Sequence, residues 1–153
     1  MRAAALDLAA LLDPDRIVIL SASARRNDVL TLLTERLARG WTPVQQDQFL
    51  LALYARERLT PTAIGKGLAV PHAQVDHLTS CCLALAVIRS GVDWEARDGQ
   101  PVRIAIGIAV RKQQRTEHLH LLALVAKTLG DPLRREAVLA ARDAAAALAA
   151  LKT

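Results

Sequence analysis

Two continuous apolar segments constrain the fold of this chain most strongly. They are Cys81 to Ile88 (CCLALAVI) and Val102 to Val110 (VRIAIGIAV). A strand with one face in water alternates apolar and polar residues, whereas a strand covered on both faces shows an unbroken apolar run. The cleaner run, Cys81 to Ile88, is far too short to span a bilayer. The two segments therefore predict central strands of a sheet that is covered on both sides.

Helical patterns alternate with the apolar segments. A shorter strand is expected at Arg16 to Leu20, and Ser23, Thr42 and Thr116 are expected as helix N-caps. The expected helices cover Asp7 to Leu12, Asn27 to Arg39, Pro43 to Glu57, a segment ending near Leu129, and one or two helices within Leu133 to Leu151. This alternation predicts an α/β sandwich with a mostly parallel central sheet.

Length and composition narrow the classes of function. With 153 residues we expect a single domain over 1–153, and 52% hydrophobic against 23% charged residues excludes a disordered chain. The net charge is +5, but the basic residues are scattered in pairs such as Arg25-Arg26 and Arg134-Arg135. Aromatic residues make up only 3%, which leaves little for stacking on bases. We therefore expect a phosphate-bearing or acidic partner, and neither nucleic acid binding nor membrane insertion.

The cysteines indicate a reducing compartment. Cys81 and Cys82 are adjacent, a spacing that rarely allows a disulfide. No signal peptide is visible, since Asp7 interrupts the apolar N-terminal stretch and no cleavage site follows. We therefore expect a cytoplasmic protein, with Cys81 and Cys82 pointing to opposite faces of a strand.

A loop rich in glycine and proline precedes the first histidine. Thr60 to His72 reads TPTAIGKGLAVPH, in which Gly65 and Gly67 allow close backbone approach to an anion. Pro71 fixes the backbone directly before the imidazole. The segment fits an oriented histidine at an anion site, and it equally fits a tight loop with an incidental histidine.

The other histidines carry weaker signals. His118 lies at the edge of the apolar stripe of a predicted helix, near the end that favours phosphate, whereas His120 faces elsewhere and is expected in solvent. His72, His77 and the two cysteines match no common zinc spacing, so no metal site is expected. A cysteine–histidine hydrolase lacks an orienting third residue.

Three segments resemble one protein family in the expected order. Arg56 to Val75 (RERLTPTAIGKGLAVPHAQV) is similar to the active-site signature of the mannitol/fructose-type enzyme IIA domains of the bacterial phosphotransferase system. Val92 to Val110 resembles the family's Asp-Gly-x-Pro-Val turn and following strand, and Glu117 to Leu129 its second histidine helix. The family fold is a mixed, mostly parallel sheet flanked by helices.

The resemblance implies a phosphoryl relay. A small phosphocarrier, HPr or its nitrogen-branch counterpart, donates a phosphoryl group to His72, with Arg56 and His118 as helpers. Thr62, Gly65, Gly67 and Pro71 then form the loop at the phosphate site. The resemblance implies no cofactor, because phosphoryl transfer between histidines in this family is expected to proceed without a metal.

The branch of the family stays open. The segment HLHLLALVAKTL (His118 to Leu129) resembles nitrogen-type members, which are regulators whose phosphorylation state sets partner binding. The alternatives are a sugar-transport enzyme IIA that passes phosphate to an enzyme IIB, and a docking module that keeps only the fold. The basic loop Arg111 to Arg115 is expected to be solvated, with contact to a partner as the alternative. The sugar, the regulated partner and the oligomeric state are not indicated.

Overall fold

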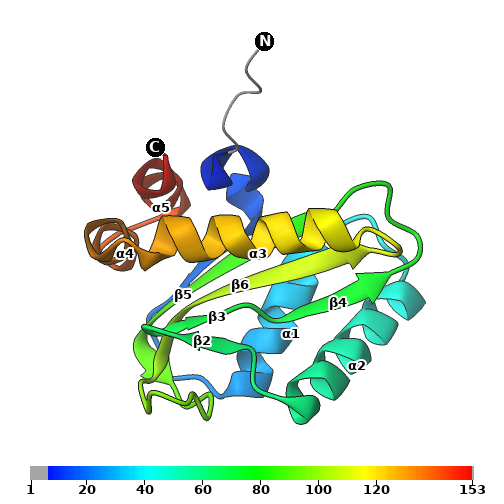
Figure 1. Ribbon diagram of the computed structural model, residues 1–153, viewed down its shortest axis with the longest axis horizontal. Coiled ribbons are helices and arrows are strands. Elements are labelled where there is room, and N and C mark those ends of the chain that lie inside the picture. The colour runs from blue at the N-terminus through cyan, green and yellow to red at the C-terminus, as the bar shows by residue number, and fades with distance from the viewer. Residues whose placement is uncertain (1–6, 153) are drawn as a thin grey trace.

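A mixed sheet lies between two layers of helices in the computed structural model, which describes residues 7–152 (Figure 1). The strand order is β1-β5-β6-β3-β2, and β4 also pairs with β6. The strands are β1 (Ile17–Leu20), β2 (Ala63–Gly65), β3 (Leu68–Ala69), β4 (His72–Val75), β5 (Cys82–Val92) and β6 (Val102–Arg111). Three of the five pairings are parallel, while the long β5–β6 pairing is antiparallel. The expected mixed α/β class is confirmed.

The helices follow the predicted order. Two 3-10 turns, η1 (Leu8–Leu11) and η2 (Pro14–Arg16), precede β1. The α-helices are α1 (Arg26–Leu37), α2 (Pro43–Leu59), α3 (Arg115–Gly130), α4 (Pro132–Leu139) and α5 (Ala144–Leu151). None of the helices in the described residues is long and apolar enough to cross a membrane.

The two apolar runs pack on both faces, as predicted. Along β5, Leu83, Leu85 and Val87 belong to the core under η1, α3, α4 and α5. The alternate residues Ala84, Ala86 and Ile88 belong to the core under α1 and α2. Cys81 packs with the first core and Cys82 with the second, so the prediction of opposite faces is confirmed.

Small residues let α1 approach the sheet. A Cβ at Gly107 of β6 would lie 3.2 Å from the Leu33 Cβ of α1. Bulkier Ile106 and Ile108 point to the opposite face, where α3 covers them (Figure 1). This division of small and large side chains fixes which face each helix covers.

Helix ends agree with the sequence in part. The Thr42 side chain accepts a hydrogen bond from the Gln45 N–H, as predicted, but α2 runs to Leu59 rather than Glu57. The prediction of Ser23 as a cap is wrong, because α1 is capped at Arg25, whose N–H donates to Asp28 at 3.0 Å. The prediction of Thr116 is also wrong, since the His118 N–H already closes the first turn of α3 onto the Gln114 carbonyl at 3.0 Å.

β3 and β4 together form an interrupted edge beside β6. Leu68 pairs with Ile104 and His72 with Ile108, so Pro71 stands between two short strands on the same neighbour. The Ile108 N–H bridges this interruption by donating to the Pro71 carbonyl at 2.9 Å. The edge ends with β4 beside α2, and α3 begins just after β6, which places both helices near His72.

Candidate functional site

His72 is the first residue of β4 and is held by its own loop. Its Nδ1 lies 2.8 Å from the Val70 carbonyl oxygen. A carbonyl oxygen only accepts, so Nδ1 carries the hydrogen. In the neutral ring the lone pair is then on Nε2, which makes Nε2 the nucleophilic atom.

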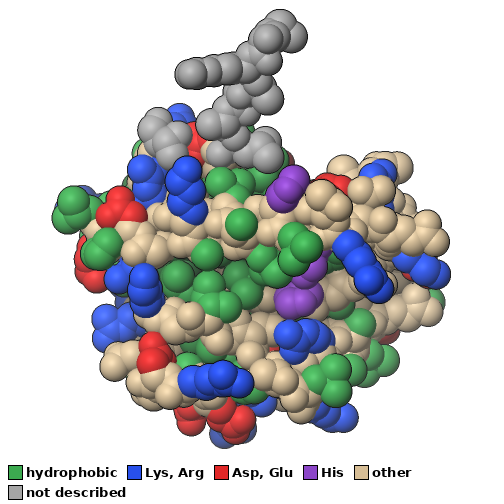
Figure 2. Space-filling model, in the orientation of Figure 1, with side chains coloured by type: hydrophobic (Ala, Val, Ile, Leu, Met, Phe, Trp, Pro, Cys, Tyr) green, Lys and Arg blue, Asp and Glu red, His purple; other side chains and the backbone are tan. Residues whose placement is uncertain are grey.

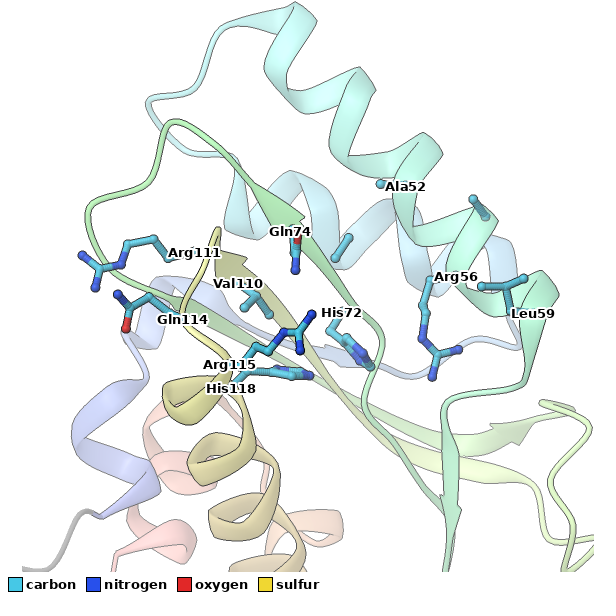
Figure 3. A pocket seen from close by; sticks show the side chains of 12 residues that line it. Ala52, Arg56, Leu59, His72, Gln74, Val110, Arg111, Gln114, Arg115 and His118 are labelled. Carbon is cyan, nitrogen blue, oxygen red and sulfur yellow. The ribbon is translucent and has the colours of Figure 1, made fainter.

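Arg56 comes from the last turn of α2. One guanidinium nitrogen donates to the Thr60 carbonyl at 2.8 Å, which holds the side chain across the end of the helix. The remaining donors of the guanidinium border the same cavity as His72. Arg56 and His118 lie on opposite sides of His72 (Figure 3).

His118 comes from the first turn of α3. Its ring centroid is 4.6 Å from that of His72, with the ring planes at 46°. Its Nδ1 is buried and has no hydrogen-bond partner within residues 7–152. Of the predicted apolar stripe, Leu121, Val125 and Leu129 are buried, whereas Leu122 is half-buried and lines a cavity.

Both histidines are biased toward the neutral form. Burial lowers the pKa of His72 and is the largest effect. The hydrogen bond to the Val70 carbonyl raises this pKa, and the smaller effects of the Arg56 and Glu57 charges lower it and raise it, respectively. Burial also lowers the pKa of His118, with added contributions from the charges of His72 and Arg56. A neutral imidazole keeps its lone pair at neutral pH, so this setting favours nucleophilic attack.

These side chains line a cavity of about 600 Å³. Its charged and titratable lining residues are Arg56, Arg111, Arg115, His72 and His118, and no acidic residue is among them. In the space-filling view, purple histidines lie in a hollow beside blue basic side chains (Figure 2). A second cavity of about 490 Å³ is also bordered by His72 and Arg56 and extends toward α3. The composition of the first cavity favours an anion.

A buried carboxylate holds the loop that leads to His72. Glu57, only 4% exposed, accepts hydrogen bonds from the Thr62 backbone N–H at 3.0 Å and from the Thr62 hydroxyl. It also accepts one from Trp94 Nε1 at 3.2 Å. Glu57 therefore fixes Thr62 to the last turn of α2, and Glu57 itself directly follows Arg56 in the chain.

The other predicted loop residues form the turn rather than the cavity wall. Gly65 and Gly67 have φ of 91° and 76° in the β2–β3 turn, with Lys66 between them at 60°. The Gly67 carbonyl accepts from the N–H groups that open β6. Neither glycine nor Pro71 lines the two cavities that His72 borders, whereas Thr62 lines the second. Their contact with phosphate stays a prediction.

The remaining candidates lie outside this arrangement. His120 is exposed, as expected, and His77 is exposed with its ring 4.6 Å from that of Trp41. Cys81 and Cys82 are both free. In the part of the chain that the structure describes, no group of three or more metal-ligating side chains occurs.

The comparison with protein families decides the assignment. Residues 10–153 match the family described as phosphoenolpyruvate-dependent sugar phosphotransferase system, EIIA 2. The chain belongs to this family. Its members are phosphotransferases that relay phosphate through a histidine.

Relatives of the chain carry more than one name. It is 31% identical over 128 residues to the 2-O-alpha-mannosyl-D-glycerate-specific EIIABC component of Escherichia coli, covering 82% of the chain and 20% of that protein. It is 29% identical over 119 residues to a nitrogen regulatory protein of Pseudomonas aeruginosa, covering 78% and 77%. Three further nitrogen regulatory proteins are matched over half of their length.

Solved structures of the family share the fold. The nitrogen regulatory protein IIA-Ntr of Neisseria meningitidis has a TM-score of 0.85 at 24% identity, covering 95% of this chain and 99% of that one. IIA mannitol of Escherichia coli has a TM-score of 0.77 at 25% identity, covering 92% and 98%. The EIIA sheet and its helices are therefore reproduced across nearly the whole chain.

Two features of this EIIA site go beyond the sequence interpretation. In the loop Arg111 to Arg115, Lys112, Gln113 and Arg115 are exposed, as expected for a solvated loop, and Arg111, Gln114 and Arg115 also line the main cavity. The sequence marks Glu57 only as the expected end of a helix, whereas the structure shows that it holds the loop that leads to His72. A signal existed for Glu57, since an acidic residue at the buried end of a helix requires donors. For the basic loop, by contrast, the sequence does not indicate which of its side chains face the cavity.

Proposed function

We propose that this chain accepts a phosphoryl group on His72 Nε2 from a phosphorylated HPr-like phosphocarrier. The observation that carries the proposal is the His72–His118 ring pair at 4.6 Å in a cavity that Arg56 also lines. We also propose that residues 1–153 form one enzyme IIA domain and act in the cytoplasm.

The transfer exchanges one P–N bond for another. The Nε2 lone pair of His72 forms the new bond while the bond to the donor histidine breaks and returns its electron pair to the donor nitrogen. The hydrogen on Nδ1 stays in place, and the Val70 carbonyl stabilises the resulting imidazolium. Arg56 and His118 bind the phosphoryl oxygens as charge shifts between the two proteins. No metal or cofactor takes part.

Within the family we favour the nitrogen-regulatory type. The similarity to the Pseudomonas aeruginosa nitrogen regulatory protein extends over more than three quarters of both chains. In this role phosphorylation of His72 sets the binding of a regulated partner protein. The second candidate is a sugar-specific enzyme IIA that passes phosphate to an enzyme IIB, favoured by the 31% identity to the mannosylglycerate-specific component. A docking module that keeps only the fold is the third.

Intact-mass measurement tests the proposal. The protein is incubated with phosphoenolpyruvate, enzyme I and either HPr or its nitrogen-branch counterpart. We expect one acid-labile phosphoryl group on the wild type and on His120→Ala, none on His72→Ala, and slower labelling of Arg56→Ala and His118→Ala. Full labelling of His72→Ala refutes the assignment of the acceptor. No labelling of the wild type by either donor would favour a docking role.

A further inference from the structure

We propose that Arg115 is a further phosphoryl-binding residue, which contacts the phosphoryl group while His72 carries it. The inference rests on the proposed function and adds a residue that the family motif does not include. It gives a ligand-binding role to one residue of a loop that is expected from sequence to be solvated.

The charged residues that line the main cavity favour an anionic ligand, because none of them is acidic. Three arginines and two histidines line it without a carboxylate. Among the described residues, Glu57 is the carboxylate that acts on the pKa of His72, and it is buried and already accepts three hydrogen bonds. Like charges gathered in this way favour an incoming group with several anionic oxygens.

The three arginines differ in how far their donors are engaged. Arg111 donates to the Thr79 carbonyl at 2.7 Å and lies 3.9 Å from the Glu117 carboxylate. Arg56 uses one nitrogen for the Thr60 carbonyl. The side chain of Arg115 makes no hydrogen bond or ion pair with any of the described residues, 7–152. Of the three, Arg115 has its whole guanidinium available to a ligand.

The direction of the side chains agrees with this difference. Arg111 points away from His72, whereas Arg115 extends from the start of α3 across the cavity on the side of His72 and His118 (Figure 3). Arg56 approaches from the other side. A phosphoryl group on Nε2 presents three oxygens, so two guanidinium groups and His118 can each bind without competing.

The test compares Arg115→Gln with Lys112→Gln. Lys112 belongs to the same loop and carries the same charge, but it faces Asp76 at 3.8 Å and does not line the cavity. Transfer from the phosphorylated donor is measured by rapid quench, with donor concentration varied to separate kcat from KM. We expect Arg115→Gln to lower kcat by about tenfold, because a charge-assisted hydrogen bond is lost. Arg115→Lys should recover part of this loss, and Lys112→Gln should change kcat less than twofold.

A second measurement detects contact with the phosphoryl group itself. In ³¹P NMR titrations of the phosphorylated proteins, removing an adjacent cation should raise the phosphoryl pKa of Arg115→Gln by roughly one unit relative to wild type. Lys112→Gln should titrate like the wild type.

The outcomes separate this inference from the proposed function. An unlabelled wild type overturns both. A labelled wild type with equal kcat and equal phosphoryl pKa in Arg115→Gln overturns only the role of Arg115. A raised KM with unchanged kcat and unchanged phosphoryl pKa also overturns it, since Arg115 would then act by docking the donor protein.

Discussion

Replacing Glu57 tests whether the buried carboxylate holds the site loop in place. Its three donors are the Thr62 N–H, the Thr62 hydroxyl and Trp94 Nε1, and Trp94 is fully buried. In Glu57→Ala the Thr62 hydroxyl can rotate toward another acceptor. The Thr62 backbone N–H and Trp94 Nε1 are fixed and would be left without an acceptor. Each buried donor left without an acceptor costs about 1–3 kcal/mol, so the loss is about 2–6 kcal/mol.

The conservative variant gives the sharper measurement. Small domains unfold with a free energy of about 5–15 kcal/mol, so the upper end of that loss would leave little folded Glu57→Ala. In Glu57→Gln the amide oxygen can replace Oε2 and keep the bonds to Thr62 N–H and Trp94, while the amide nitrogen donates to the Thr62 hydroxyl. Only the charge assistance is lost, about 1–2 kcal/mol.

Urea denaturation followed by far-ultraviolet circular dichroism measures both effects. The expected order of unfolding free energy is wild type, then Glu57→Gln, then Glu57→Ala, with unchanged m-values. Glu35→Ala is the control, since Glu35 is exposed on α1 and a surface change of this kind stays within about 0.5 kcal/mol. If Glu57→Ala lost less than 1 kcal/mol, the three bonds would not be holding the loop, and the reasoning would be wrong.

Two further predictions concern pH and the glycine turn. Because burial lowers the folded pKa of His72 and His118 below the ordinary 6.5, the unfolded chain binds more protons just below that pH. The unfolding free energy should therefore fall as pH drops from 7.5 to about 5, and the His72→Ala/His118→Ala double variant, unlike His120→Ala, should flatten this slope in urea titrations. Gly67→Ala combines a φ of 76° with a Cβ 3.3 Å from a carbonyl oxygen, whereas Gly40→Ala has a φ of 81° and open space. Thermal or urea unfolding should show a loss of about 2 kcal/mol or more for Gly67→Ala and about 1 kcal/mol for Gly40→Ala, and equal losses would contradict the steric argument.

Local pattern predicted the frame of the molecule. The unbroken apolar runs gave both central strands, because a strand covered on two faces has no polar side to show. Thr42 and Pro43 predicted the start of α2, because a capping hydroxyl and a fixed φ act within one turn. The same local reasoning failed at Ser23, because the helix begins after Arg25 and the Asp28 carboxylate accepts a hydrogen bond from the Arg25 N–H instead. Between competing caps, only the actual backbone path decides.

The sequence by itself determined β1, β5, β6 and the order of the helices, since these follow from periodicity and near neighbours. It left the short strands around His72 undefined, and local pattern alone fitted an anion site and an incidental loop histidine equally well. The family resemblance implied Arg56 and His118 as helpers, but only the tertiary structure shows how they reach His72. His118 reaches it because α3 starts where β6 ends beside β4, and Arg56 because α2 ends next to the same edge. It also separated Arg115, which faces the cavity, from Arg111, which is engaged elsewhere. Such choices depend on contacts between distant segments, and the spacing of residues along a chain does not encode them.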